Sequence, residues 1–220
     1  MKIRYLGHSS FLLTDGLGTR IVTDPYEGVG FSMPRGVQAE GVSVSHAHFD
    51  HCNAAAISGN PVIFDKAGNF ALNAVQISAV NSFHDEVGGK KRGPNLIFRF
   101  QMDGMTVCHF GDLGEPCSPA RIESVGPVDI LLIPVGGNYT IDAVQAKEYV
   151  DKLRPAVIIP MHYKTPKLKI DLCPLAPFID AAKDCRIHNL NDCEASVSRM
   201  SLGEDRVIVL RPYDAERDEA

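Results

Sequence analysis

The stretch His46-Ala47-His48-Phe49-Asp50-His51 places three imidazoles and one carboxylate within six residues, directly after the apolar run Val42-Ser43-Val44. Side chains two apart on an extended segment point the same way, so the first two histidines are placed to hold one metal ion from one side. Asp50 and His51 belong to the turn after the strand, from which they can reach a second ion. Imidazole and carboxylate ligands suit zinc, manganese or iron, and a hydroxide shared between two such ions is a strong nucleophile near neutral pH. The stretch therefore predicts a two-metal site.

The alternative interpretation is a polar loop in which histidines cluster by chance. The chain has eight histidines in 220 residues, so three of them within six positions are not expected at random. We therefore favour the metal-binding interpretation.

A two-metal site needs more ligands than one segment can supply, and the chain offers them at the ends of other apolar segments. Loops held by rigid strands position ligands precisely, so these residues are the next candidates. Residues 74–80 lead to His84, residues 105–110 to His109 and Asp112, and residues 155–160 to His162.

These segments resemble the metallo-β-lactamase-fold hydrolases, in the branch of short stand-alone proteins that includes the ascorbate-6-phosphate lactonase-like enzymes. The resemblance covers nearly the whole chain, and it implies the α/β (α+β) class, with a four-layer αββα sandwich and the metals at one edge of the paired sheets. The matching segments are Tyr5–Phe11 with the opening strand, Ile21–Pro25 with the strand-ending Asp-Pro, Phe110–Asp112 with the Gly-Asp step, and Ile158–Tyr163 with the closing ligand strand.

Carried over position by position, the resemblance implies two divalent ions, with zinc expected first and manganese or iron as alternatives. It assigns His46, His48 and His84 to the first ion, Asp50, His51 and His162 to the second, and Asp112 to a bridging position. Asp50 is also the expected catalytic residue, which orients the nucleophile or accepts its proton. His109 is the rival of His84, because His84 is assigned by its order in the chain and not by a rigid motif.

Other residues are expected around the ions. An Asp before a proline, such as Asp24, is typical of a turn, but beside a metal site we expect Asp24 to orient a ligand. We expect the same of His109 if it is not itself a ligand. His8 is expected in the pocket wall. Asn138 and Tyr163, with Tyr139, are candidate donors to an oxyanion.

A flexible cationic loop follows His84, and its residues Lys90, Lys91 and Arg92 are candidates for binding an anionic group of the substrate. The alternative is a solvated turn. Two helix starts are also predicted, one at Ser118-Pro119 with an end at Gly126, and one at Thr140 with an end near Leu153.

Length and composition fit one domain, which we expect at residues 1–213, followed by a charged tail at residues 214–220. A net charge of −5 and a pI near 5.9 provide no broad basic face, so nucleic acid is not an expected partner. Without a long apolar segment or a hydrophobic leader, we expect a cytoplasmic protein with no membrane partner. The six cysteines form no Cys-x-x-Cys pair, which favours free thiols.

Together these features predict a metal-dependent hydrolase that cleaves an ester-like, lactone or phosphodiester bond in a small substrate, which the cationic loop suggests is anionic. Two alternatives are kept: a metal-binding or sensing module without turnover, and a di-iron redox protein of the same fold. Redox relatives tend to carry Glu where this chain has His48, which favours hydrolysis. The sequence leaves the substrate and the oligomeric state open, a homo-oligomer included.

Overall fold

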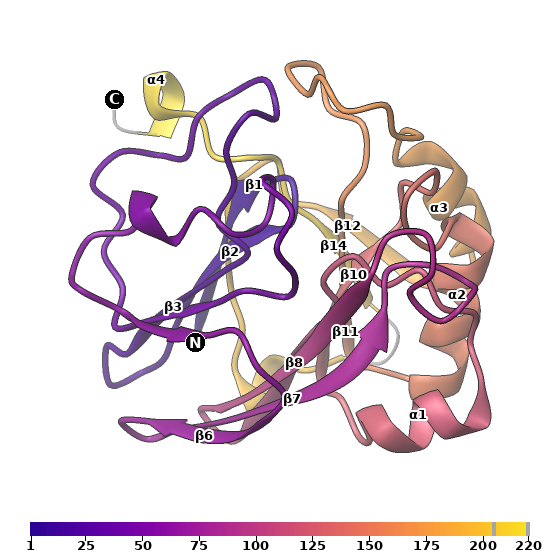
Figure 1. The fold of residues 1–220 in the computed structure, drawn as a ribbon, viewed down its shortest axis with the longest axis horizontal. Helices are drawn as coiled ribbons and strands as arrows, with labels where there is room; N and C mark the ends of the chain where they lie inside the picture. Colours follow the sequence, from indigo (N-terminus) through magenta and orange to yellow (C-terminus); the bar gives the residue numbers. More distant parts are fainter. Residues whose placement is uncertain (204–205, 219–220) are drawn as a thin grey trace.

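The computed structural model describes residues 1–203 and 206–218. Two β-sheets pack face to face, and three helices lie on the outer side of one of them (Figure 1). The predicted sandwich is therefore confirmed.

The first sheet has six strands in the order β13-β1-β2-β3-β4-β5. Its β1, β2 and β3 form an antiparallel meander, and β3, β4 and β5 run parallel. The strands are β1 (Lys2–Gly7), β2 (Ser10–Thr14), β3 (Arg20–Thr23), β4 (Gly41–Ser43), β5 (Val62–Phe64) and β13 (Glu194–Ser196).

The second sheet has eight strands in the order β12-β14-β11-β10-β9-β8-β7-β6. The half from β12 to β9 is parallel, whereas β9, β8, β7 and β6 pair antiparallel. The strands are β6 (Gly68–Leu72), β7 (Val75–Phe83), β8 (Pro94–Met102), β9 (Met105–His109), β10 (Ile130–Pro134), β11 (Val157–Met161), β12 (Arg186–Asn189) and β14 (Arg206–Val209).

The main core lies between the sheets. Alternate residues of the first sheet, such as Tyr5 and Phe11, pack in one buried cluster with residues of the second sheet, such as Phe98, Phe100 and Ile159. Burial of this apolar surface drives the two sheets together. In the central parallel strands β10 and β11 every residue is buried, because helices cover their other face.

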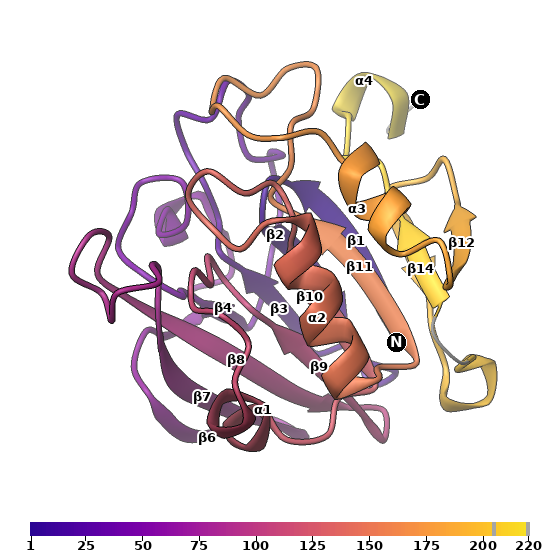
Figure 2. The ribbon, with the colours of Figure 1, turned by 90° about the vertical axis from the view of Figure 1, so that its right-hand side faces the viewer.

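Three helices cover the outer face of the eight-stranded sheet, as Figure 2 shows for α1 (Pro119–Val125), α2 (Ala143–Leu153) and α3 (Ala176–Ala181). The Ser118 hydroxyl accepts from the backbone of Arg121 and Gly126 ends α1 with a φ of +68°, so the first predicted helix is correct. The predicted cap at Thr140 is wrong. Asp142 caps α2 instead, because its carboxylate accepts from two backbone N–H groups and Gln145 completes a capping box.

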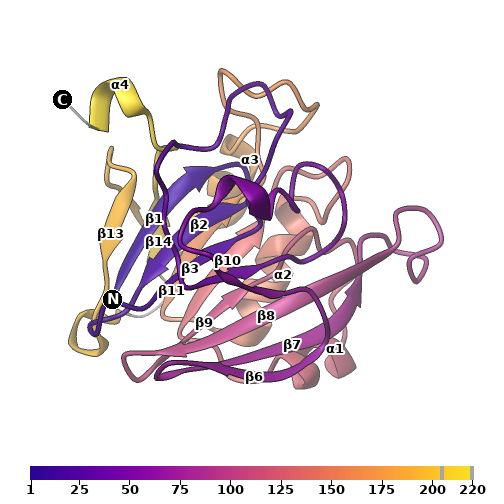
Figure 3. The ribbon, with the colours of Figure 1, turned by 60° about the vertical axis from the view of Figure 1, so that its left-hand side comes forward.

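The outer layer over the six-stranded sheet contains no α-helix among the described residues. Loops and the single 3-10 turn η1 (Ala54–Ala56) cover it instead, and Figure 3 shows them in front of β1, β2 and β3. Tyr26, Val29 and Ile57 of this layer pack on Leu6 and Val22 of the sheet. The fourth layer of the sandwich is thus built mainly from loops.

The predicted charged tail begins with Asp214 and the single-turn helix α4 (Ala215–Asp218), and residues 219–220 lie outside the described part. Asp218 pairs with Arg211, which ties α4 back to the domain. The boundary at residue 213 stays a prediction. In the part of the chain that the structure describes, no helix combines the length and apolar character needed to cross a membrane.

Candidate metal centre

The predicted ligands converge because each follows the end of a strand. Strands β1 and β4 of the first sheet lead to His8 and to the stretch that begins at His46. Strands β7, β9 and β11 of the second sheet lead to His84, Asp112 and His162. Both sheets therefore contribute, and the centre lies where their strand ends meet.

A first group contains His46, His48 and His84, whose ring nitrogens lie within 4.8 Å of one another. His46 Nε2 is 3.0 Å from His48 Nδ1. His46 and His84 are buried, whereas His48 is exposed. Three imidazoles that face one point from three directions can hold one ion.

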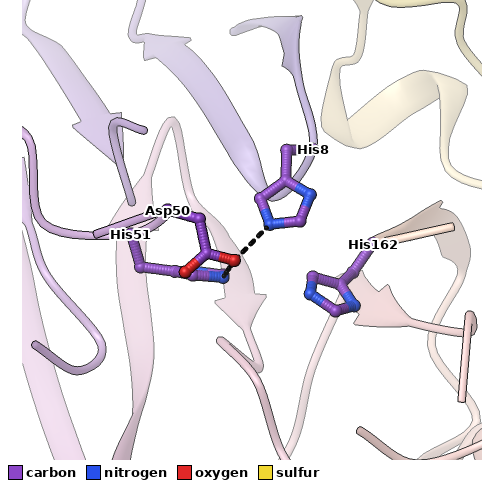
Figure 4. A group of neighbouring side chains, drawn as sticks. All are labelled: His8, Asp50, His51 and His162. Atoms are coloured by element: carbon purple, nitrogen blue, oxygen red, sulfur yellow. Dashed lines mark hydrogen bonds and ion pairs between the residues drawn. The ribbon is translucent and has the colours of Figure 1, made fainter. Parts of the chain in front are cut away.

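A second group contains His8, Asp50, His51 and His162 (Figure 4). Asp50 Oδ2 lies 3.1 Å from His8 Nε2 and 3.7 Å from His51 Nε2. The rings of His8 and His162 are 4.5 Å apart between centroids. This group contains the three residues assigned to the second ion, and it adds His8.

Asp112 lies between the two groups. Its Oδ2 is 3.2 Å from Nε2 of His51, 3.2 Å from Nε2 of His162 and 3.3 Å from Nε2 of His84. A single carboxylate oxygen therefore contacts members of both groups. This is where the resemblance places a bridging carboxylate, although coordination by Asp112 itself stays a prediction.

Buried polar atoms at this centre support metal binding. His51 Nε2 and Asp112 Oδ1 are buried without a hydrogen-bond partner in the described part of the chain, which is unusual for buried polar atoms. Burial lowers the pKa of His46 to about 3 and also lowers the pKa of His84, so both rings are neutral at pH 7, which is the form of imidazole that binds a metal. The donor set of imidazoles and carboxylates fits a divalent ion of the zinc, manganese or iron type.

His51 differs electrostatically from its neighbours. Burial lowers its pKa, but the carboxylates of Asp112 and Asp24 more than compensate and raise the pKa well above its usual value. Nearby histidines keep the pKa of Asp112 well below the usual range, despite the opposing effect of burial. These two carboxylates favour a proton on the His51 ring, and His51 would have to lose that proton to serve as a metal ligand.

Asp24 orients two histidines of the centre. Its Oδ2 lies 2.8 Å from His51 Nδ1 and accepts from the Ser45 hydroxyl, while Oδ1 accepts from the Ser45 backbone at 2.8 Å. Ser45 Oγ is in turn 3.0 Å from His46 Nδ1. These contacts support the role predicted for Asp24. The sequence analysis missed Ser45, whose position directly before His46 was its only signal.

His109 occupies a different place from its rival His84. Its Nε2 lies 2.8 Å from the backbone carbonyl of Ser9, and its Nδ1 accepts from the backbone of Gly111 at 3.2 Å. With both nitrogens engaged by the backbone, His109 has no lone pair to offer a metal. The structure therefore groups His84, and not His109, with His46 and His48.

Asn95 is a second residue that sequence reasoning missed. Its side-chain carbonyl accepts from the Asp112 backbone at 3.0 Å, and its amide donates to the carbonyl of Phe110 at 3.0 Å. Asn95 thus fixes the backbone that presents Asp112. Its position at the start of β8 carried no sequence signal for this role.

Two other predicted residues do not face the centre as expected. The Tyr163 hydroxyl donates to the carbonyl of Leu210 at 3.3 Å, and its ring packs in the outer core, so the proton needed for the predicted oxyanion role is already engaged. The side-chain amide of Asn138 donates to the carbonyl of Asp171 at 2.8 Å. Asn138 therefore links two loops, and its amide is already engaged.

The cationic loop is also more constrained than predicted. Lys91 pairs with Glu86, and Arg92 donates to the carbonyl of Asn138 at 3.1 Å and lies over the ring of Tyr139. Two of the three candidate anion-binding side chains thus have partners within the protein, while Lys90 is exposed.

The family model of the beta-lactamase superfamily domain matches residues 2–162. The chain therefore belongs to this superfamily, and its sandwich is the metallo-beta-lactamase fold. A solved structure from Thermotoga maritima, assigned to the metallo-beta-lactamase superfamily, is 36% identical, covers 95% of this chain and 98% of that chain, and has a TM-score of 0.77.

A curated relative and a second solved structure are also similar to this chain. A UPF0173 metal-dependent hydrolase from Pelotomaculum thermopropionicum is 29% identical over 89% of this chain and 99% of its own length. Igni18, a metallo hydrolase from Ignicoccus hospitalis, is 22% identical, covers 97% of this chain and 96% of that chain, and has a TM-score of 0.67. At that identity the likeness to Igni18 shows the fold alone.

Proposed function

We propose that this metal-dependent hydrolase of the metallo-beta-lactamase superfamily binds two divalent ions, zinc first among the candidates, and cleaves an ester-like, lactone or phosphodiester bond in a small-molecule substrate. The observation that carries the proposal is the position of Asp112. One of its oxygens lies 3.2–3.3 Å from ring nitrogens of both histidine groups, as a carboxylate shared by two ions requires.

The roles of the residues follow from their contacts. His46, His48 and His84 would hold one ion, and Asp50, His51 and His162 the other, with Asp112 between them. Such ions, when bound, lower the pKa of water and polarise a carbonyl or phosphoryl oxygen. Asp24 fixes the direction of the His51 ring through Nδ1, which leaves Nε2 facing Asp112.

Asp50 is the proposed catalytic carboxylate. Burial raises its pKa, but the contacts with His8 and His51 outweigh burial and keep the pKa below its usual value, so the group is ionised at pH 7. Burial also lowers the pKa of His8 to about 4, so the His8 ring is neutral and its Nε2–H can donate a hydrogen bond to Oδ2 of Asp50. That bond leaves the other carboxylate oxygen to bind an ion, orient water or accept its proton.

The first experiment is elemental analysis of protein purified without added metal, for the wild type, His48→Ala and Asp112→Ala. We expect about two ions per chain in the wild type and fewer in both variants, because each loses a proposed ligand. Lys66→Ala, outside both groups, is the control. If the wild type neither contains nor takes up metal, and the variants do not differ from it, the two-ion proposal is wrong.

Turnover separates hydrolysis from its alternatives. After chelation and return of the metal found, the protein is tested on generic ester, lactone and phosphodiester substrates. Metal-dependent cleavage supports the hydrolase. Tight metal binding without conversion of any substrate favours the binding module, and iron that is oxidised and reduced reversibly favours the redox protein.

A further inference from the structure

A cavity of about 500 Å³ lies between three parts of the chain, at residues 31–35, at residues 165–167, and at residues 211–214 together with Arg217. Its volume is in the range of sites that bind small molecules. None of the predicted ligands lines it.

The first wall rests on the strand end that presents His8. Phe31 packs so closely on Gly7 that a Cβ atom at Gly7 would lie 2.8 Å from the Phe31 ring. The Tyr26 ring meets Phe31 edge to face at 5.2 Å, and the Tyr26 hydroxyl donates to the carbonyl of Leu6 at 2.8 Å. The cavity is therefore fixed to the chain directly before His8.

The other two walls are fixed beside His162 and β1. The segment at residues 165–167 begins three residues after His162. The backbone N–H of Lys169, just beyond this segment, donates to the carbonyl of Val29 at 2.8 Å and so joins the second wall to the loop of the first wall. In the third wall, the backbone of Tyr213 donates to the carbonyl of Tyr5 in β1 at 2.9 Å. All three walls thus adjoin the side of the centre formed by His8 and His162.

The described side chains of this cavity combine apolar surface with positive charge. Phe31, Met33 and Pro166 are among its apolar residues, and its cations are Arg35, Lys167, Arg211 and Arg217. Lys167 pairs with Asp214 at 3.1 Å, and Arg211 pairs with Asp218. Arg35 and Arg217 have no ion pair within the described part of the chain. Two cations therefore remain for a ligand, in a protein whose net charge is −5.

A second cavity, at the first group of histidines, does not share this positive charge. It has a volume of about 590 Å³, and Ser45 and His46 are among its lining residues. Its charged lining residues are Asp65 and Lys66, one of each sign. One cavity is thus lined by His46 and has no excess charge, whereas the other is cationic and is held by the chain that leads to His8. A substrate therefore has two distinguishable directions of approach.

We propose that the cationic cavity binds the non-reacting part of the substrate, and that this part has an apolar body and a carboxylate or phosphate group. Arg35 and Arg217 pair with the anion, since guanidinium groups match the geometry of both oxyanions. The bond to be cleaved then reaches the centre from the side of His8 and His162. This proposal rests on the proposed function, and it places the anion site at Arg35 and Arg217 instead of the loop at Lys90.

Binding of short amphiphiles tests the site without turnover. Hexyl phosphate, hexanoate and hexanol are titrated calorimetrically into the protein as purified, with its metal content measured, at two salt concentrations. We expect one or both anions to bind at least about tenfold more tightly than hexanol, because only the anions form charge-assisted hydrogen bonds with the guanidinium groups, and we expect salt to weaken their binding. The stronger of hexyl phosphate and hexanoate identifies the preferred oxyanion.

Matched variants locate the binding. The double variant Arg35→Gln with Arg217→Gln is expected to bind the preferred anion at least about tenfold more weakly, whereas Lys66→Gln in the second cavity and Lys90→Gln in the loop leave the affinity unchanged. Circular dichroism and metal content confirm that each variant is folded and loaded. Equal affinity in the double variant and the wild type, or no binding of either anion, overturns the proposal. Metal content and turnover are separate measurements, so the hydrolase proposal can stand if this one fails.

Discussion

The backbone N–H of His162 donates to the backbone carbonyl of His8 at 2.9 Å, and both residues have positive φ angles, +52° and +56°. This bond joins the end of β11 in one sheet to the end of β1 in the other. Positive φ is uncommon for residues other than glycine and costs about 1–2 kcal/mol per residue. Neighbouring bonds offset this strain, since the same carbonyl also accepts from the Tyr5 hydroxyl at 2.8 Å. This backbone conformation brings both rings together with Asp50 and His51 in the second group.

Two substitutions at His8 can distinguish the effect of its side-chain contact with Asp50 from the effect of its positive φ angle. Gln can reach Asp50 about as far as His8 Nε2 does, whereas Asn is too short but tolerates the positive φ better. If the contact with Asp50 matters, we expect His8→Gln to bind metal more tightly than His8→Asn, with a loss of about 10–100-fold in the latter. Competition with a chromogenic chelator measures the affinities. The reverse order would mean that His8 acts through its backbone conformation alone.

Asp24→Asn should weaken metal binding through the rings it orients. The amide cannot accept as well from both His51 and Ser45, so we expect a loss of about 10–100-fold in affinity. Ser45→Ala removes only the link to His46 and should cost less. Both affinities follow from the same chelator competition. An Asp24→Asn protein that is folded and binds metal like the wild type would reduce Asp24 to a turn residue.

Most residues of the candidate centre could be predicted from the sequence, because the proposed ligands follow apolar segments that form strands. The stretch from His46 to His51, Asp112 and His162 were found in this way. The contact of His8 with Asp50 joins residues 42 positions apart and depends on a positive φ, which no local pattern encodes. Asn95 was missed for the same reason, since it acts on Asp112, 17 positions away. Ser45 is next to His46, but it links that ring to Asp24 only because the fold brings Asp24 to its hydroxyl.

The missed elements of the fold are short and exposed. Every residue of β12 and β6 is exposed or half-buried, so neither strand has the alternating buried positions of β7. The start of α2 was misplaced although Asp142 and Gln145 carried the capping-box signal. Thr140 is suitable as a cap by residue type, but only Asp142 has a glutamine three residues later, Gln145, to complete the capping box.

Asp85 is expected to make stability depend on pH. Its carboxylate accepts from the backbone N–H groups of Val87, Gly89, Lys91 and Arg92 at 2.8–3.0 Å. Burial raises its pKa, but these four bonds outweigh burial and lower the pKa to about 2. A lowered carboxyl pKa adds stability above the usual value of 3.8, and this is lost as the pH falls towards 2.

The substitution Asp85→Asn should therefore lower the urea midpoint at pH 7, and its difference from the wild type should shrink between pH 4 and pH 2. Trypsin should also cleave the variant faster after Lys90 and Lys91, because the loop loses its central acceptor. Glu86→Gln, which removes only an exposed pair with Lys91, is the control and should change little. A difference that stays constant with pH would mean that the carboxylate does not supply this stability.

Gly136 tests whether the position of His162 sets the occupancy of the second ion. A Cβ atom at Gly136 would lie 2.1 Å from the backbone oxygen of His162, so a methyl group must displace the strained residue that carries the ring. We expect Gly136→Ala to lose about 1–3 kcal/mol in the free energy of unfolding, and to bind one ion fewer than the wild type by elemental analysis. Gly203→Ala is the matched control, because its Cβ would meet no atom of the described residues within 4 Å. If Gly136→Ala is destabilised but keeps its full metal content, the centre adapts to a displaced His162. If it is neither destabilised nor depleted, the close packing against His162 does not constrain the site, and the strain at that residue has no role in holding metal.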